Sequence, residues 1–507
     1  EDSKQENKTE NRNNASVQLE RNKIEQTDAN NNDTQTTLFL TNIVENKEDN
    51  KYKVLEFIKI IGNHNERNRM FTPECIYQSK YSFLSSGTNN EIKIYNMNFD
   101  EYKGLITEEL KEWIYSLYER DINKNNESEF IVCSFKEISL LRISNKQFVD
   151  NKKWNVPNMT CLACAEVKIK EMPKQQQHQP KKKKNKNPKE NKEHISEYLI
   201  IAGRNGIKYI VDVFKDKNKN DKELNLDLNN FYIDRDNSFR SVFKLSETRI
   251  AFTSNAIIPD GKNKLIIYNF NKSNDKDKIS DNSKKRGGIE YPKKIEEETE
   301  NENYSFIASN NGMASYNENI LLCACKKYTK KDKNGILLLI IKEDKNKDKN
   351  EVDNKNNNDK NNELKVEKIF YHTEDFEVYC FCNIIEKKTD GVQDDVNVRT
   401  EPFVKTDFFF VGGFDKNLRE GKIKLFKYEK SYKNEIIGIK FLQDVEIEEK
   451  KETENGIKPK KFEGFGGAIN SIVQHYCKLN IIVSCYDGKI YQLSKPNLKP
   501  YTANNVN

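Results

Sequence analysis

The chain has 507 residues, enough for one large domain or for about two to four domains of ordinary size. Its 86 basic and 80 acidic residues nearly balance, and a net charge of +6 does not require nucleic acid or a membrane as partner. The longest apolar run, residues 335–341, has the length of a strand, so no membrane span is predicted. No secretory leader is recognisable.

Only 35% of the residues are hydrophobic, but the polar residues are concentrated in a few segments rich in Lys, Asn, Asp and Glu. Most cysteines lie in apolar stretches, where a free thiol packs as a small hydrophobic group. Ten cysteines in 507 residues are too few for a disulfide scaffold, which favours a reducing, intracellular compartment. Within the cell, we expect the cytoplasm rather than the nucleus. The ten are Cys75, Cys133, Cys161, Cys164, Cys323, Cys325, Cys380, Cys382, Cys477 and Cys485.

Residues 1–35 are polar and Asn-rich, and we expect a disordered or helical tail there. A weak apolar stripe of Val17, Leu19 and Ile24 leaves the end of a coiled coil as an alternative. From residue 36 the composition changes, and residues 37–44 and 52–61 have the β-branched and aromatic content of strands. Residues 499–507 are expected to form a second tail.

A pattern of apolar strand, small polar turn and second apolar strand occurs seven times, which is typical of one structural unit stacked many times. Its clearest copies are residues 82–96, 198–214, 408–428 and 481–493. The first apolar residues after the turns are Ile92, Ile138, Ile207, Leu265, Ile336, Ile423 and Ile490. The first strand of each unit is apolar on successive residues, as in a strand buried on both faces.

The turns of these units have the chemistry of hairpins. Asn-Gly and Asp-Gly tolerate the positive φ angles of a tight turn. The tight turns are predicted at Asn205-Gly206, Asn334-Gly335 and Asp487-Gly488, and looser ones at Asn89-Asn90, Asp260-Gly261 and Glu420-Gly421.

The spacing of the units is irregular because charged, Asn-rich segments are inserted between strands. These segments cannot bury enough apolar surface to offset the loss of chain entropy, so we expect exposed, mobile loops. They lie near residues 173–197, 271–303, 343–362, 386–405 and 446–461. One segment, residues 107–118, places Leu110, Trp113, Ile114 and Leu117 at helical spacing. We predict a helix there, at the edge of a unit rather than as a dedicated docking helix.

The seventh unit reads Ser484-Cys485-Tyr486-Asp487-Gly488-Lys489-Ile490, and the sixth reads Gly421-Lys422-Ile423-Lys424-Leu425. This sequence resembles the end of a WD-repeat unit, Ser-Gly-Ser-x-Asp-Gly-x-Ile-x-Leu-Trp-Asp. The opening Gly-His of the family is missing, so only Ser484 and Asp487 of its polar network carry over. The family's Trp position is always apolar or aromatic here, with Tyr95, Leu141, Ile210, Tyr268, Leu339, Phe426 and Leu493.

The resemblance implies an all-β fold, a seven-bladed β-propeller over residues 36–498 with long disordered insertions. The last unit ends after its third strand, and the strand at 52–61 would supply the fourth. Such a strand would close the ring and remove its exposed edges.

Metal and catalytic motifs are not predicted. Cys161 and Cys164 are spaced as zinc ligands, but zinc needs four ligands and no second matching pair or nearby His is present. Cys323 with Cys325, and Cys380 with Cys382, have the spacing of one strand face. The five histidines, His64, His178, His194, His372 and His475, form no motif. We therefore expect no cofactor, no metal and no catalytic residue.

These observations favour a non-catalytic scaffold that binds other proteins within a larger complex. The expected contact points are the unit turns at Asn89, Asn205, Lys416 and Asp487. A nucleic-acid-associated subunit is the alternative, based on the lysines from Lys181 to Lys184, although no aromatic residues alternate with them. An enzyme on a propeller scaffold is the second alternative. No membrane partner is expected.

Overall fold

The computed structural model describes strands and the short turns between many of them. The described residues are 55–63, 73–78, 83–87, 92–95, 114–120, 128–134, 137–144, 147–156, 160–171, 194–211, 223–225, 229–232, 235–246, 249–258, 263–269, 293–296, 304–307, 312–328, 333–343, 364–387, 403–453, 456–475 and 478–498. Within these residues the regular elements are all strands, so the predicted all-β class is confirmed. The same residues contain no helix that is long and apolar enough to cross a membrane.

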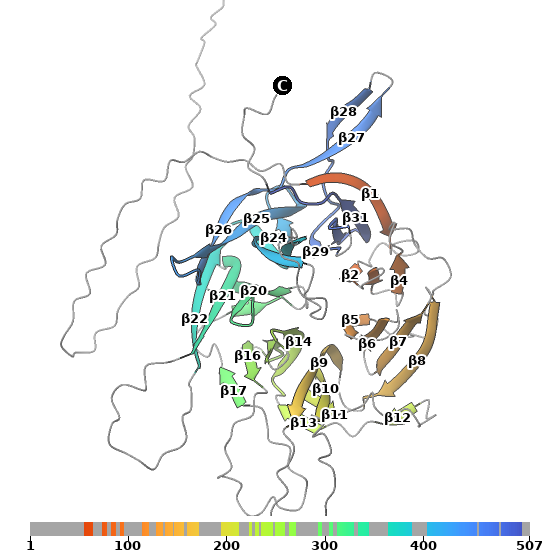
Figure 1. The fold of residues 1–507 in the computed structure, drawn as a ribbon, viewed down its shortest axis with the longest axis vertical. Coiled ribbons are helices and arrows are strands. Elements are labelled where there is room, and N and C mark those ends of the chain that lie inside the picture. Colours follow the sequence, from red (N-terminus) through yellow and green to blue (C-terminus); the bar gives the residue numbers. More distant parts are fainter. Residues whose placement is uncertain are drawn as a thin grey trace, which may run out of the picture. The chain divides into compact units, whose positions relative to one another are not determined.

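The strands form seven sheets, which we number in chain order (Figure 1). Sheet 1 contains β2 (Pro73–Gln78), β3 (Phe83–Gly87) and β4 (Ile92–Tyr95). Sheet 2 contains β5 (Ile114–Arg120), β6 (Ser128–Ser134), β7 (Glu137–Ser144), β8 (Gln147–Asn155) and β12 (Glu223–Asn225). Sheet 3 contains β9 (Cys161–Glu171), β10 (His194–Gly203), β11 (Gly206–Val211) and β13 (Asn229–Tyr232). Sheet 4 contains β14 (Asn237–Lys244), β15 (Arg249–Ala256), β16 (Lys264–Asn269) and β17 (Lys293–Glu296).

The remaining three sheets are also mainly antiparallel. Sheet 5 contains β18 (Tyr304–Phe306), β19 (Met313–Ser315), β20 (Ile320–Lys327), β21 (Lys333–Glu343) and β22 (Leu364–His372). Sheet 6 contains β23 (Phe376–Lys387), β24 (Phe403–Asp415), β25 (Glu420–Lys430) and β26 (Ile436–Asp444). Sheet 7 contains β1 (Leu55–Asn63), β27 (Ile447–Thr453), β28 (Gly456–Lys461), β29 (Ile469–Gln474), β30 (Ile481–Cys485) and β31 (Lys489–Leu493). Sheets 2 and 7 each include one parallel pair, β12 with β8 and β1 with β27.

Apolar cores lie between consecutive sheets. One cluster joins sheets 2 and 3, a second joins sheets 3 and 4, and further clusters join sheets 4 and 5, 5 and 6, and 6 and 7. The strands that precede the unit turns explain this packing. In two of them, β15 and β20, the first six residues are buried on both faces of the sheet. This is the predicted consequence of apolar residues on successive positions. Tyr95 of sheet 1 packs against Ile482 and Ile490 of sheet 7.

Strand β1 joins the sheet formed by the last part of the chain, as Figure 1 shows. It pairs antiparallel with β31 and parallel with β27. Glu56 N–H donates to Ser494 Oγ, and Ser494 N–H donates back to Glu56 O. Phe57 packs against Phe462 and Tyr491, with ring centroids 5.2 and 6.5 Å away. The N-terminal strand therefore fills the fourth position of the last unit, as the sequence predicts.

Residues 446–461 do not form the expected exposed loop. They build β27 and β28, a hairpin whose first strand continues the ladder beyond β1. Its register places residues of opposite charge across from each other, Glu448 opposite Lys461 and Glu449 opposite Lys460, and Lys460 Nζ lies 3.6 Å from Glu449 Oε2. Cross-strand pairs of opposite charge stabilise a sheet without an apolar core, which composition alone does not reveal. Strands β10, β17, β23 and β24 also extend into the other expected insertions.

The predicted helix at 107–118 is wrong for its described part. Ile114 to Tyr118 belong to strand β5, which pairs antiparallel with β6. Ile114, Ser116 and Leu117 are buried in that strand. Ile114 and Leu117 fit helical spacing and a bulged strand equally well, and pairing with β6 decides between them. Residues 107–113 lie outside the described residues.

Two predicted turns lie inside strands. Asn334 and Gly335 belong to β21 and pair with Lys326 and Cys325 of β20, so the turn lies further out. Glu420 and Gly421 belong to β25, and the turn is formed by residues 416–419. A β-carbon on Gly335 would collide with the carbonyl oxygen of Tyr371, so the glycine permits close strand contact there rather than a turn.

Several predictions fall outside the described residues. They concern the tails at 1–35 and 499–507, the strand at 37–44, the turns at Asn89-Asn90 and Asp260-Gly261, and the lysines from Lys181 to Lys184.

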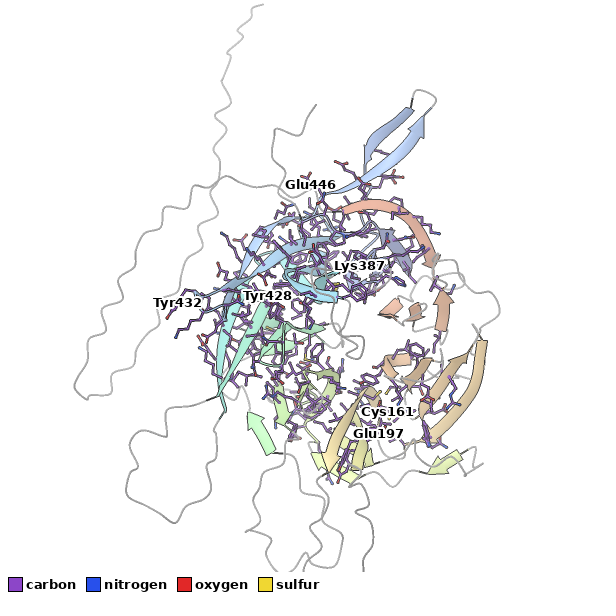
Figure 2. The ribbon with its side chains drawn as sticks, viewed as in Figure 1. Cys161, Glu197, Lys387, Tyr428, Tyr432 and Glu446 are labelled. Carbon is purple, nitrogen blue, oxygen red and sulfur yellow. The ribbon has the colours of Figure 1, made fainter. Side chains whose placement is uncertain are left out.

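A buried ionic cluster ties sheet 2 to sheet 3. Arg120 of β5 contacts Glu129 of β6 at 2.6 Å, Glu166 of β9 at 2.8 Å and Glu197 of β10 at 3.5 Å. Glu197 is labelled in Figure 2. Arg142 of β7 holds the second oxygen of Glu129 at 2.7 Å. Removing one member of such a buried cluster leaves an uncompensated charge and typically costs about 3–5 kcal/mol, so the cluster fixes how these two sheets pack.

Candidate functional site: a surface of strand-connecting turns

In sheets 3 to 7, the two strands of each strand–turn–strand unit are joined by a turn, and these turns lie at corresponding ends of the sheets. These turns follow β10, β15, β20, β24 and β30, respectively. We call their described outer residues the turn surface, which comprises Arg204, Asn205, Ile257, Ile258, Tyr328, Lys416, Asn417, Leu418, Arg419, Tyr486 and Asp487.

A backbone hydrogen bond of one kind recurs in three of these turns. The first turn residue donates its N–H to the segment that leads into the first strand of the same sheet. Ile257 donates to Asp236 at 2.7 Å, Lys416 to Asp375 at 3.1 Å, and Tyr486 to Ala468 at 2.8 Å. The three turns are therefore held in the same way, at the same end of their sheets.

Neighbouring sheets are also linked at this end. Arg204 forms an isolated bridge with Ser238, the second residue of β14, and Gly421 forms one with Phe465 before β29. Between sheets 4 and 5, the Asn255 side-chain amide donates to Phe306 O at 2.8 Å, while Phe306 N–H donates back to its oxygen at 3.0 Å. Lys326 of sheet 5 acts electrostatically on Glu377 of sheet 6. The turn ends of sheets 3 to 7 therefore form a continuous surface.

Exposed apolar side chains gather on this surface. Ile257 and Ile258 are each 45% exposed, Tyr328 is 42%, Leu418 is 58% and Tyr486 is 62% exposed. They occupy four consecutive sheets and are five of the eleven large apolar or aromatic side chains that are exposed among the described residues. Single exposed apolar residues are ordinary, whereas a run of them at equivalent positions indicates a binding surface.

The structure places three of the four predicted contact residues on the turn surface, and the fourth, Asn89, lies outside the described residues. Asn205 has φ 71° and Gly206 has φ 117°, so the predicted tight hairpin turn is confirmed. Sequence reasoning did not single out Leu418 or Tyr486. An apolar residue within a polar turn was the available signal.

Asp487 organises the turn between β30 and β31. Its Oδ1 accepts the N–H of Lys489 at 3.0 Å, and its Oδ2 accepts the hydroxyl of Tyr491 at 3.0 Å. Burial, together with the nearby Asp487 charge, raises the pKa of Tyr491. The aspartate that the WD-repeat pattern predicted therefore bonds to a tyrosine on the next strand. Ser484, the other carried-over position, is buried in β30.

Lys416 belongs to an ion pair at the edge of sheet 6. Its Nζ lies 2.9 Å from Glu377 Oε1, and the hydroxyl of Tyr379 donates to Glu377 Oε2 at 2.7 Å. Burial opposes ionisation of Glu377, but the hydrogen bonds from Lys416 and Tyr379 outweigh it and lower the pKa. In the same turn Asp415 pairs with Lys422 at 3.1 Å. These charges hold the turn in place.

The cysteine pairs lie in the core. Cys161 and Cys164 are buried in β9, between sheets 2 and 3. Burial raises the pKa of Cys382 to about 12 and also that of Cys380, so both thiols stay protonated near neutral pH. Among the residues that the structure describes, no cluster of three or more His, Cys, Asp or Glu side chains has the arrangement of a metal site.

Comparison with known proteins yields no family. No family model matches the chain, and no curated protein matches it. Among solved structures, the Dos1 propeller is 9% identical, with a TM-score of 0.35 over 83% of this chain and 78% of that chain. The computationally designed Ika8 protein is 10% identical, with a TM-score of 0.36 over 86% of this chain and 99% of that chain. Similarity this low identifies no relative, and the WD-repeat resemblance stays a prediction.

Proposed function

We propose that the protein is a non-catalytic scaffold that binds other proteins through the turn surface. One observation supports this most directly: exposed apolar side chains occupy equivalent turns of four consecutive sheets. A surface of this kind offers aromatic and aliphatic anchors for a partner, with charged residues around them. The carboxylates of Glu377 and Asp415 are held in ion pairs, an arrangement suited to a fixed surface rather than to proton transfer.

At the level of the fold, we propose a seven-bladed propeller that β1 closes. Each sheet packs against the next, β2 contacts both β5 and β29, and β1 fills the fourth position of sheet 7. Closure by a strand from the other end of the chain leaves no unpaired inner edge. Deleting residues 50–62 should therefore lower the melting temperature sharply, as measured by circular dichroism. An unchanged melting temperature would refute closure by this strand.

Affinity purification of the tagged full chain, followed by mass spectrometry, tests the scaffold proposal. The variant Leu418→Ser/Tyr486→Ser removes two anchors from the turn surface and should deplete the partners recovered with the wild-type chain. The matched control is Tyr432→Ser. Tyr432 is 93% exposed in the turn between β25 and β26, at the opposite end of sheet 6 (Figure 2). Equal recovery by both variants and the wild type would contradict the proposal.

A further inference from the structure

Three arginines lie near Ser238, in the bridge to it or within three residues of it in the chain, where sheet 3 meets sheet 4. Arg204 forms a backbone bridge with Ser238, and Arg240 Nε lies 3.5 Å from the Ser238 hydroxyl oxygen. Arg235 lies three residues before Ser238, in the segment that leads into β14. Ser238 is buried, whereas all three arginines are exposed. Buried backbone contacts therefore fix the positions from which three guanidinium groups reach into solvent.

These arginines differ from the lysines further along the turn surface. Among the described residues, Arg204, Arg235 and Arg240 form no ion pair, and with Asp236 included the group still has three positive charges against one negative. In sheets 6 and 7, Lys416, Lys422 and Lys489 lie 2.9, 3.1 and 3.5 Å from a carboxylate. Counted over the described residues, the charge of the arginines is in excess, and a positive potential attracts anionic groups.

Two aliphatic side chains lie beside this charge. Ile257 and Ile258 are exposed, and the hydrogen bond from Ile257 N–H to Asp236 O joins their turn to the residue that follows Arg235. We define the arginine patch as Arg204, Arg235, Arg240, Ile257 and Ile258.

We propose that the arginine patch binds an acidic segment of a partner protein that also carries aliphatic side chains. The planar guanidinium group matches a carboxylate with two parallel hydrogen bonds, and the isoleucines provide an apolar contact between the charges. Nucleic acid is disfavoured because the described apolar side chains of the patch are aliphatic rather than aromatic and offer unpaired bases no ring to stack on. This inference rests on the proposed function and names the chemistry of a partner at one part of the turn surface.

Fluorescence anisotropy with the purified full chain tests the inference. The probe is a short labelled peptide in which glutamate alternates with leucine. The variant Arg204→Gln/Arg235→Gln/Arg240→Gln should weaken binding of this peptide at least about tenfold. The matched control, Lys342→Gln/Lys430→Gln/Lys460→Gln, removes the same amount of charge from lysines that pair with carboxylates outside the turn surface and should change affinity less than about threefold. Circular dichroism confirms that both variants are folded.

Three results of the binding assay would overturn the inference: no binding of the peptide by the wild-type chain, an equal loss in both variants, or tighter binding of a single-stranded oligonucleotide that is lost only in the arginine variant. The last result would assign the patch to nucleic acid. The proposed function is judged separately, because partner capture by the Leu418 and Tyr486 positions does not depend on the arginines. If the arginine variant recovers every partner and the Leu418→Ser/Tyr486→Ser variant does not, the scaffold stands and the acidic partner is excluded.

Discussion

Two sheet junctions on the turn surface are built from the same backbone element but carry different side chains. Sheet 3 meets sheet 4 at the Arg204–Ser238 bridge, and sheet 6 meets sheet 7 at the Gly421–Phe465 bridge. Arg204 sends its side chain into solvent, whereas Gly421 is buried with no room for a side chain. The same kind of bridge aligns the neighbouring sheets at both junctions. The residues that form the bridge determine whether the junction is closely packed or carries an exposed charged side chain.

The largest expected effect is on the packed junction. A β-carbon on Gly421 would collide with the backbone carbonyl of Gly467 and approach Ile469 and Phe465. Gly421→Ala should therefore lower the free energy of unfolding by about 1–3 kcal/mol, measured by urea denaturation. The matched substitution Arg204→Ala should change it by less than about 0.5 kcal/mol. Equal losses in the two variants would show that the junctions are not different in kind.

A second contrast concerns hydrogen bonds beside each bridge. Tyr491→Phe keeps the packing against Phe57, Phe462 and Phe465 but removes the hydroxyl that donates to Asp487. We expect a loss of about 1–2 kcal/mol in unfolding free energy, because the acceptor is charged. Ser238→Ala removes only the contact at 3.5 Å with Arg240 and should cost much less. A larger loss for Ser238→Ala would reverse the comparison.

A pH titration tests the packing of sheet 7, which contains a buried histidine at the end of β29 away from the Gly421–Phe465 bridge. Burial, reinforced by the charge of Lys478, lowers the pKa of His475 to about 4. The unfolded chain binds this proton near pH 6.5, so the stabilisation is complete above that pH and is lost as the pH falls toward 4. His475→Gln should flatten the stability–pH curve in this window. A curve with the same slope as that of the wild type would contradict the buried neutral histidine.

The smallest expected effect is that of the exposed ion pair at Lys416. Its Nζ lies 2.9 Å from Glu377 Oε1, but the lysine side chain is 44% exposed, so water and salt screen the pair. Lys416→Gln should lower the unfolding free energy by at most about 1 kcal/mol, with the difference shrinking in high salt. A loss that is large and independent of salt would mean that the pair is more important for stability than its exposure suggests.

Sequence patterns predicted what depends on local chemistry. The apolar runs predicted the buried strands that precede the unit turns, and Asn205-Gly206 predicted a tight turn. The absence of a fourth strand from the last unit predicted that an N-terminal strand, β1, would pair with β31. The patterns failed where the secondary structure is determined by pairing with strands that are distant in the sequence. Ile114 and Leu117 have helical spacing but pair with β6, and the charged residues of β27 are ordered by their pairing with β1 and β28.

The residues of the candidate site also divide into those that local sequence patterns predicted and those that only the fold brings out. Lys416 and Asp487 were predicted because turns carry polar residues, and both lie on the turn surface. Leu418 and Tyr486 were not predicted, since a single apolar residue in a turn has no distinct pattern until equivalent turns are aligned in space. The arginine patch was also invisible in the sequence. Arg204 and Arg235 are 31 positions apart in the chain, and it is the bridge from Arg204 to Ser238 that places Arg204 against the strand which Arg235 precedes.

Site-specific photocrosslinking tests the central claim, that partner proteins bind at the turn surface, most directly. A benzophenone amino acid would replace Tyr328 or Tyr486 on the turn surface, or Tyr432 in the turn between β25 and β26 as the control. All three tyrosines are exposed, so each position can carry the probe. The account predicts that the two turn-surface positions crosslink the same partner in cells and that Tyr432 does not. Crosslinks from Tyr432 alone, or equally from all three positions, would contradict it.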